Sequence, residues 1–500
     1  MLRAARVSSL LLLSLAVLGC DQPATTTPEA ARVEATTKAG EGKGALALYL
    51  HEPGDQPGPS SACDVDLCTS LLALIEGAEH SIDFAIYGMR GQPDILSALE
   101  RAKARGVVIR GVVDRDAQGN NYYTNTDQLA ARLGDVRDDR KVDRELERED
   151  AKRARGDKFS TDACKRPEGF AGFVQCLAYD LGDRCLLATH ASREPFGVAV
   201  AGEDGEEPKA YNKIMHDKFF VVDGRWLWTG STNVSDTCSG GYNANLALVV
   251  DSPTVAGWYT QEFETMWTEG EYHQKKPKSA GPRETKVGDA EVSVFFSPQD
   301  RTIEREVRPL IQAASKRIDI AVFFLTHKLI TKDLIDAHLR GVEIRVIMDA
   351  TGASNGYTKH ELLRAVGIPV KIENWGGKMH MKSALIDGET LIVGSMNWTS
   401  AGEWDNDENT LIIRDAALAQ QYQGFFDTLW AELPDTWLTR NPDPESKDSG
   451  NSCADGVDND HDHLADDQDP GCGPNPPAMD ALPPHWIIDK TQVTCQHPPT

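Results

Sequence analysis

The sequence predicts an α/β protein made of two tandem α-β-α sandwich domains, with a small irregular extension at the C-terminus. Strand-like and helix-like stretches alternate along residues 44–275 and again along residues 285–436, which is typical of layered α/β domains. The two stretches repeat the same elements in the same order, apart from one insertion, which indicates a duplicated domain rather than a short solenoid repeat. A chain of 500 residues with 40% hydrophobic content is long enough for two or three domains.

The expected elements follow the same order in both halves. The first half has expected strands at 46–53, 81–87 and 107–114 and expected helices at 71–78 and 93–104. The second half has expected strands at 292–298, 317–324, 342–349 and 411–413 and expected helices at 307–314, 329–339 and 416–433. Three residue pairs match at an offset of 235, namely Gly106 with Gly341, Arg110 with Arg345, and Asp114 with Asp349.

The halves differ by an insertion at about residues 115–205. Asp114 and His216 are 102 positions apart, whereas Asp349 and His380 are 31 apart, so the first half carries about 71 extra residues. Residues 137–158 are mostly charged, which predicts a solvated helix or a mobile arm. The insertion precedes a motif described below, so it is either a lid that selects substrate or plain surface decoration.

The N-terminus has the features of an export signal. Arg3 and Arg6 precede an apolar stretch that ends at Gly19, as in a secretory signal peptide at residues 1–19. Cys20 directly after Gly19 resembles a bacterial lipoprotein box, which implies a lipid anchor in the cell envelope facing the periplasm or the exterior. Residues 20–43 would then be a flexible tether. The alternative is a plain signal peptide in which Cys20 is incidental.

Charge and cysteine content bear on partners and compartment. The formal net charge is -25, which disfavours non-specific binding to a nucleic-acid backbone unless a local basic groove exists. If the protein is exported, disulfides are expected. The candidate pairs are Cys63 with Cys68, which flank a short loop, and Cys453 with Cys472, which flank another. Cys238 is the candidate free thiol, and the sequence lacks the CxxC pairs and histidine spacings of a zinc site.

One motif occurs twice with identical internal spacing, H-x-K-x4-D-x6-G-S-x-N. Its chemical residues are His216, Lys218, Asp223, Ser231 and Asn233, and again His380, Lys382, Asp387, Ser395 and Asn397. Residues two apart on a strand share a face, so each histidine projects beside its lysine. The aspartates are expected at the far end of that strand.

These residue types suit a phosphodiester. A lysine ammonium and an asparagine amide can bind the phosphate oxygens as charge develops. One imidazole can attack phosphorus, and a second can protonate the leaving alcohol and later deprotonate water. Each motif supplies one histidine, so the two copies must line one cleft. The residue types alone do not say which histidine is the nucleophile.

Over residues 45–435, apart from the insertion, the two motifs resemble those of the phospholipase D superfamily. The resemblance implies two domains related by pseudo-twofold symmetry and a phosphohistidine intermediate, with no metal or other cofactor in catalysis. It further implies His216 as nucleophile and His380 as general acid/base. Glu408, 28 residues after His380, would orient His380, while Asn245, Asp236 or a backbone carbonyl would orient His216.

The leading expectation for function is a phospholipase D that removes the head groups of glycerophospholipids and leaves phosphatidic acid. The alternatives are a metal-independent nuclease of the same superfamily, a transphosphatidylase of the cardiolipin-synthase type, and a catalytically silent binding protein. The expected partner is a phospholipid or membrane surface rather than nucleic acid, and the chain is expected to be a monomer. Aromatic residues near the first motif, at Trp226, Trp228 and Tyr242, are read either as lipid contacts or as core.

The tail at residues 437–500 is rich in acids, cysteine and proline. One stretch spaces its acids as in a twelve-residue calcium loop, with Asp458, Asp460, Asp462, Asp466 and Asp469 at positions 1, 3, 5, 9 and 12. It resembles the Asp-rich calcium repeats of secreted bacterial proteins. The alternative is an acidic linker in which these side chains are only solvated.

Overall fold

The computed structural model describes residues 44–53, 56–150, 173–180, 185–192, 198–201, 213–278, 281–355, 358–474 and 486–493. The predicted signal peptide and tether at residues 1–43 lie outside these ranges, as does much of the predicted insertion. Within the described ranges, no helix combines the length and the apolar character that crossing a bilayer requires.

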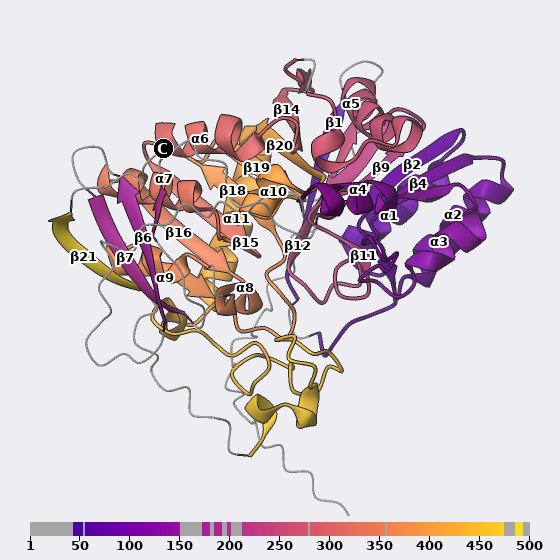
Figure 1. The fold of residues 1–500 in the computed structure, drawn as a ribbon. Coiled ribbons are helices and arrows are strands. Elements are labelled where there is room, and N and C mark those ends of the chain that lie inside the picture. The colour runs from indigo at the N-terminus through magenta and orange to yellow at the C-terminus, as the bar shows by residue number, and fades with distance from the viewer. Residues whose placement is uncertain are drawn as a thin grey trace, which may run out of the picture. The chain divides into compact units, whose positions relative to one another are not determined.

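The first half is built on a seven-stranded mixed sheet in the order β1-β12-β10-β9-β2-β4-β5 (Figure 1). Its strands are β1 (Ala45–His51), β2 (Ser81–Ile86), β4 (Val108–Val113), β5 (Val136–Asp138), β9 (Lys218–Val222), β10 (Trp226–Gly230) and β12 (Asn245–Asp251). Strands β2, β4 and β5 run parallel, and β9 joins β2 antiparallel. Two short strands, β3 (Met89–Arg90) and β11 (Val234–Ser235), pair beside it.

Helices cover both faces of this sheet. On one face lie α1 (Asp66–Gly77), α2 (Pro93–Ala104) and α3 (Thr126–Leu133), whose apolar side chains pack with Phe84 and Phe220. On the other face lies α5 (Pro253–Glu264), which continues as the π-helix η1 (Thr265–Glu269) and packs against Phe219 and Leu227. The predicted α-β-α sandwich is therefore confirmed, with the helix expected at 71–78 beginning earlier, at Asp66.

The second half repeats this plan on an eight-stranded sheet in the order β13-β14-β20-β19-β18-β15-β16-β17. Its strands are β13 (Glu284–Val287), β14 (Ala290–Ser297), β15 (Arg317–Val322), β16 (Glu343–Met348), β17 (Val370–Ile372), β18 (Lys382–Ile386), β19 (Thr390–Gly394) and β20 (Glu408–Arg414). Its helices are η3 (Ile303–Val307), α6 (Arg308–Ala313), α7 (Lys328–Leu339), α8 (Ala350–Ser354), α9 (His360–Val366), α10 (Ser400–Trp404) and α11 (Ala416–Glu432).

The two halves also share the glycine that ends a helix before a parallel strand. Gly106 after α2 and Gly341 after α7 both have φ of +96°. This left-handed region suits glycine, so each helix can end and turn directly into the next parallel strand. The recurrence explains why a glycine stands at both places in the sequence.

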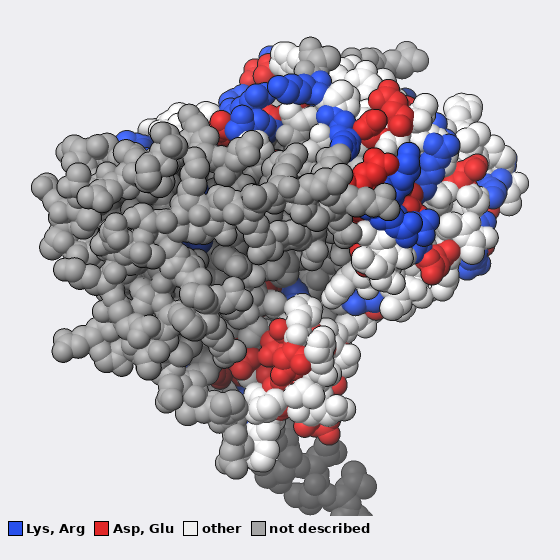
Figure 2. All heavy atoms as spheres, viewed as in Figure 1, with Lys and Arg blue, Asp and Glu red and all other residues white. Residues whose placement is uncertain are grey.

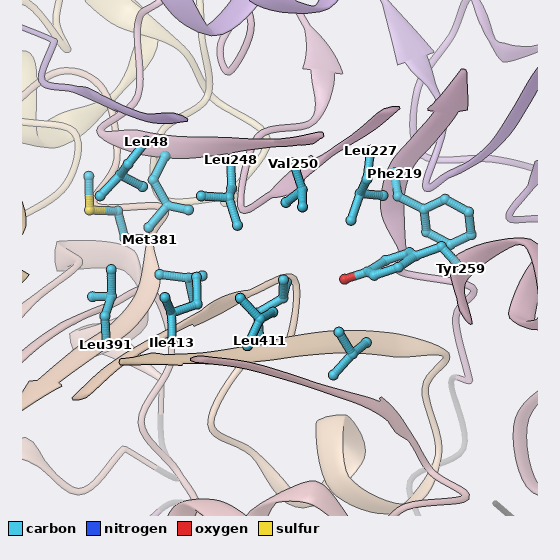
Figure 3. Close-up of a cluster of buried hydrophobic side chains, with 14 of the residues drawn as sticks. Leu48, Phe219, Leu227, Leu248, Val250, Tyr259, Met381, Leu391, Leu411 and Ile413 are labelled. Carbon is cyan, nitrogen blue, oxygen red and sulfur yellow. The ribbon is translucent and has the colours of Figure 1, made fainter. Parts of the chain in front are cut away.

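The two halves share one apolar core. Figure 3 shows Leu48, Leu248 and Val250 of the first half facing Leu391, Leu411 and Ile413 of the second. Helices α5 and α11 contribute to the same core, whereas each half keeps a separate core on its outer face. Burial of this shared surface fixes one sheet against the other, and the two copies of the motif therefore have a defined relation.

The described part of the insertion has two pieces. The charged stretch forms α4 (Arg140–Asp150), one of the two forms predicted for it, but Val142, Asp143 and Leu146 on it are buried, so the helix is solvated on one side only. Beyond it, β6 (Phe173–Asp180), β7 (Cys185–Ser192) and β8 (Val198–Ala201) form a four-stranded sheet. Its fourth strand comes from the tail, β21 (Trp486–Val493).

The tail at residues 441–474 is irregular apart from two 3-10 turns, η5 (Asp466–Gln468) and η6 (Pro470–Cys472). Two more such turns occur earlier, η2 (His273–Lys275) and η4 (Asp435–Leu438). Disulfides join Cys63 to Cys68 and Cys453 to Cys472, as expected. Cys238 is a free, buried thiol, also as expected.

Candidate active site

The two histidines of the motifs stand at the junction of the two sheets. His216 lies two residues before β9, and its backbone N–H donates to the carbonyl of Asp407 in the other half at 2.9 Å. His380 lies two residues before β18, and its N–H donates to the carbonyl of Ala244 in the first half, also at 2.9 Å. Each motif segment is thus held by the backbone of the opposite half, which brings both histidines to one junction.

The ring of His216 is oriented by a carboxylate from the second half. Both carboxylate oxygens of Glu408 lie 2.9 Å from His216 Nδ1. Ser395 Oγ donates to Glu408 Oε2 at 2.7 Å, and Asn406 Nδ2 donates to Oε1 at 3.2 Å. This corrects the expectation that Glu408 would orient His380. Glu408 begins β20 right after Asp407, which bridges to Met215, so its side chain is delivered across the junction.

The ring of His380 is oriented by an amide from the first half. His380 Nδ1 lies 3.0 Å from Asn245 Oδ1, and Ser231 Oγ donates to the same oxygen at 2.9 Å. Asn245 was expected to serve His216, so this assignment is exchanged as well. Position 245 is an amide where position 408 is a carboxylate, and the two imidazoles are therefore unequal. A carboxylate stabilises positive charge on a ring more than an amide does.

The two lysines make the site electropositive. Lys218 Nζ donates to the carbonyl of His216 at 2.8 Å, and Lys382 Nζ donates to that of His380 at 2.6 Å. Burial lowers the pKa of Lys218 to about 8. Burial and the charge of Lys218 hold the pKa of Lys382 well below its usual range. Two cations forced together in a buried place favour an anion between them.

The pKa of each imidazole is lowered in the free site. Burial, followed by the charges of Lys218 and Lys382, holds the pKa of His216 well below its ordinary value. The pKa of His380 is lowered by the same causes. Burial raises the pKa of Glu408 to about 8. When Glu408 is ionised, it accepts the Nδ1 proton of His216 and leaves the Nε2 lone pair free for attack.

The serines and asparagines of the motifs have different tasks. Ser231 and Ser395 bind Asn245 and Glu408, as described above, so they position the groups that orient the rings. Asn233 Nδ2 lies 3.9 Å from Cys238 Sγ. Among the residues that the structure describes, Asn233 Oδ1 and Asn397 Oδ1 are buried without a hydrogen-bond partner. Each asparagine therefore has a spare acceptor oxygen, and a phosphate oxygen would have to be bound by its Nδ2 donor.

The two aspartates of the motifs do not belong to the site. Asp223 lies five residues beyond Lys218, which is about 17 Å along an extended strand. Its carboxylate accepts the backbone N–H groups of Glu79, His80 and Ser81 at 2.7–3.0 Å. Asp387 likewise accepts those of three consecutive residues, Ser315, Lys316 and Arg317. The catalytic role predicted for both is wrong, and they fix a loop between helix and strand instead.

Several residues at the site lie outside the two sequence motifs. Tyr87 meets the His216 ring edge-on at 5.4 Å, and Phe323 lies 5.2 Å from the His380 ring. They follow β2 and β15, the duplicated strands, and that equivalence is the signal that would have found them. Cys238 Sγ lies 3.8 Å from His380 Nδ1. Trp228 and Tyr242 are buried, so of the two readings of these aromatic residues the core reading holds for them.

The tail acids gather, but not as the loop spacing predicts. Asp458, Asp460 and Asp462 approach one another, and Glu445, Asp460 and Asp469 form a second group. Figure 2 shows the acidic side chains concentrated over the tail segment. The carboxylate of Asp466 instead accepts the backbone N–H groups of Asp455 and Gly456 at 3.0–3.2 Å. Glu445, which the spacing does not include, joins Asp460 and Asp469 in the second group.

Comparisons with known proteins agree with this geometry. Residues 195–267 and 307–430 match the family described as "Cardiolipin synthase, PLD-like domain". The chain is 33% identical over 151 residues to a phospholipase D of Rickettsia bellii, covering 30% of this chain and 74% of that protein. It is 35% identical over 118 residues to a mitochondrial cardiolipin hydrolase of Chlamydomonas reinhardtii, covering 24% of this chain and 53% of that protein. This last match therefore spans about half of its relative.

A solved structure, the phosphatidylserine synthase of Haemophilus influenzae, superposes with a TM-score of 0.43 at 13% identity, covering 75% of this chain and 85% of that one. The duplicated motif, the pairing of its histidines across two sheets and the match to the Rickettsia protein lead to one conclusion. The chain belongs to the phospholipase D superfamily.

Proposed function

We propose that this protein is a phospholipase D that hydrolyses the head-group phosphodiester of glycerophospholipids. The observation that carries the proposal is the unequal pair of imidazoles, with His216 on the Glu408 carboxylate and His380 on the Asn245 amide. Two relatives named phospholipase D and cardiolipin hydrolase support a phospholipid as the substrate.

The first half-reaction forms a covalent intermediate. The phosphate oxygens are bound by Lys218 and Lys382 and by the asparagine amides. His216 Nε2 donates its lone pair to phosphorus, and the bond from phosphorus to the head-group oxygen breaks. His380, protonated at Nε2, gives that proton to the leaving oxygen, so a neutral alcohol departs.

The second half-reaction regenerates the enzyme. Water gives its proton to His380 Nε2 as its oxygen bonds to phosphorus, and the bond between phosphorus and His216 Nε2 breaks. Phosphatidic acid is then the product, and His380 is again protonated for the next cycle. If another alcohol replaces water, the same steps yield a new phosphodiester, which is the transfer reaction suggested by the description of the matching family.

Three further features belong to the proposal. The N-terminal sequence supports export and lipid anchoring at Cys20, which would hold the enzyme at its substrate. The tail acids support a structural calcium ion, with catalysis itself independent of a cofactor. On the face in Figure 2, basic and acidic side chains are mixed over the first half, which favours lipid over a nucleic-acid backbone.

The test uses three substrates under one condition. The purified full chain is incubated with phosphatidylcholine vesicles, with cardiolipin vesicles and with plasmid DNA, and head-group release, phosphatidic acid and nicking are measured. We expect phosphatidic acid from at least one lipid and intact plasmid, with all turnover lost in His216→Ala. Plasmid nicking without lipid turnover would replace the proposal by the nuclease alternative.

A further inference from the structure

A buried cluster of one histidine and two aspartates lies behind the catalytic segment. His273 and Asp139 have fully buried side chains, and the side chain of Asp143 is 8% exposed. Asp139 immediately precedes α4 and Asp143 lies one turn into it, so both carboxylates share a helix face. His273 stands in the segment that joins the two halves, 130 residues later in the chain.

The facing atoms of these three residues converge at ion-pair distances, in a geometry that is not that of a hydrogen bond. His273 Nε2 lies 3.0 Å from Asp143 Oδ1 and 3.4 Å from Asp139 Oδ2. Within the part of the chain that the structure describes, none of these three buried atoms has a hydrogen-bond partner. The two carboxylate oxygens therefore lie to the sides of the Nε2–H bond direction. A hydrogen bond needs the acceptor to lie close to that direction.

The same distances suit atoms bound to one metal ion. Bonds of 2.0–2.2 Å from zinc to imidazole nitrogen and carboxylate oxygen place tetrahedral ligand atoms about 3.3 Å apart. The candidate ligand atoms also all lie within 4.8 Å of one another. One imidazole with two carboxylates is a ligand set that borderline divalent ions accept.

The surroundings hold the ligands as an outer shell would. Asp139 Oδ1 accepts the backbone N–H of Arg115 at 2.7 Å, which leaves Oδ2 to face His273. On the other side of the ring, Asp407 Oδ2 lies 3.2 Å from His273 Nδ1. A carboxylate on the second nitrogen is the usual companion of a metal-bound histidine, because it fixes the tautomer and strengthens the ligand.

We propose that Asp139, Asp143 and His273 form a structural binding site for one zinc-like divalent ion. The site ties the start of the insertion to the segment between the halves. Asp407 connects it to catalysis, because the Asp407 carbonyl accepts the backbone N–H of His216. The ion contacts no substrate, so the phosphohistidine chemistry proceeds without it, and its task is to hold the His216 segment in place.

The test measures zinc bound to the intact protein. The full chain is incubated with Zn²⁺, dialysed against metal-free buffer and analysed by mass spectrometry for zinc per chain, with circular dichroism as the check of folding. We expect about one zinc per chain in the unmodified protein and less than about a tenth of that in Asp143→Asn and His273→Gln. A matched control, Asp460→Asn, removes an acid from the tail cluster and should keep the zinc.

X-ray absorption on the unmodified zinc protein gives a result that does not depend on how the variants fold. We expect nitrogen and oxygen ligands at about 2.0–2.1 Å that include one imidazole. The proposal is overturned if the protein retains no more zinc than His273→Gln, if Asp460→Asn loses the ion while Asp143→Asn keeps it, or if the absorption shows sulfur ligands.

Discussion

Glu408→Gln tests the unequal pairing of the two histidines most sharply among single substitutions. Gln has the shape of Glu and can still meet Ser395 Oγ and Asn406 Nδ2, which bind the Glu408 carboxylate at 2.7 and 3.2 Å. It removes the negative charge that faces His216 Nδ1 at 2.9 Å and replaces one acceptor oxygen by an NH2 donor, from which Ser395 Oγ can accept. His216 would then have a neutral amide partner, as His380 already has in Asn245.

The magnitude follows from the contact that changes. A hydrogen bond to a charged group is worth about 1.5–3 kcal/mol, and each 1.36 kcal/mol of barrier is a factor of ten in rate. If the carboxylate supports the charge that His216 gains on attack, kcat should fall roughly 10- to 150-fold. KM should change much less, because Glu408 does not touch the substrate.

The assay is steady-state release of head group from lipid vesicles, with kcat and KM determined separately. Glu403→Gln is the matched control, because Glu403 is also a buried acid of the second half but binds the backbone of Ile303 and Glu304. We expect the control to stay within about twofold of the unmodified enzyme in kcat. A Glu408→Gln enzyme with kcat equally unchanged would refute the role of this carboxylate.

Three further predictions concern pH, the motif aspartates and the tail. Activity should peak near pH 8. Glu408, whose pKa is raised to about 8, must lose its proton to accept the Nδ1–H of His216, while Lys218, whose pKa is lowered to about 8, must keep its proton. If the increase of activity with pH below the optimum persists in Glu408→Gln, this explanation is contradicted. Asp223→Asn should lower the free energy of unfolding by roughly 1–2 kcal/mol in denaturant titrations, with kcat within about twofold of the unmodified enzyme. Partial burial raises the pKa of Asp223, but hydrogen bonds from three backbone N–H groups lower it by more. The stability that the Asp223 carboxylate contributes is therefore present above about pH 4 and is lost as the pH falls below it. A large loss of kcat without loss of stability would restore a catalytic role. Calcium should raise the thermal midpoint of the full chain by binding its folded state, and Asp460→Asn should abolish that rise without changing kcat; an equal rise in the variant would exclude the tail site.

The fold was predictable because the sequence states it twice. Alternating strands and helices, with glycines that recur after α2 and α7, indicate the same layered domain in both halves, and the structure confirms it. The histidines and lysines were identifiable for a similar reason. A lysine two residues after a histidine, at the start of a buried strand, must project beside it.

The partners across the junction could not be predicted from spacing. Glu408 lies 28 residues after His380 in the chain, yet it orients His216, because β20 begins where the second half meets the first. Asp223 and Asp387 were misjudged for the opposite reason. They belong to the motif in sequence, but a strand five residues long separates them from the histidines.

The burial of Asp143 also could not be predicted from the sequence. The charged stretch that becomes α4 gives no sign that Asp143 turns inward to meet His273, because its partner is 130 residues away. A stretch of charged residues usually indicates a solvated helix face. Here one acid of that stretch, Asp143, contacts His273 between the two halves.

Trapping the covalent intermediate tests the central claim most directly. His380→Gln lacks the group that activates water and also the group that protonates the leaving oxygen, so the substrate is a phosphatidyl ester of p-nitrophenol, whose leaving group needs no proton. The variant is mixed with vesicles of this ester, denatured rapidly and digested, and its peptides are weighed by mass spectrometry. We predict a phosphatidyl adduct on His216 that accumulates in this variant and is absent from His216→Gln. An adduct on His380 in the His216→Gln enzyme, or none on His216 while head group is released, would contradict the account.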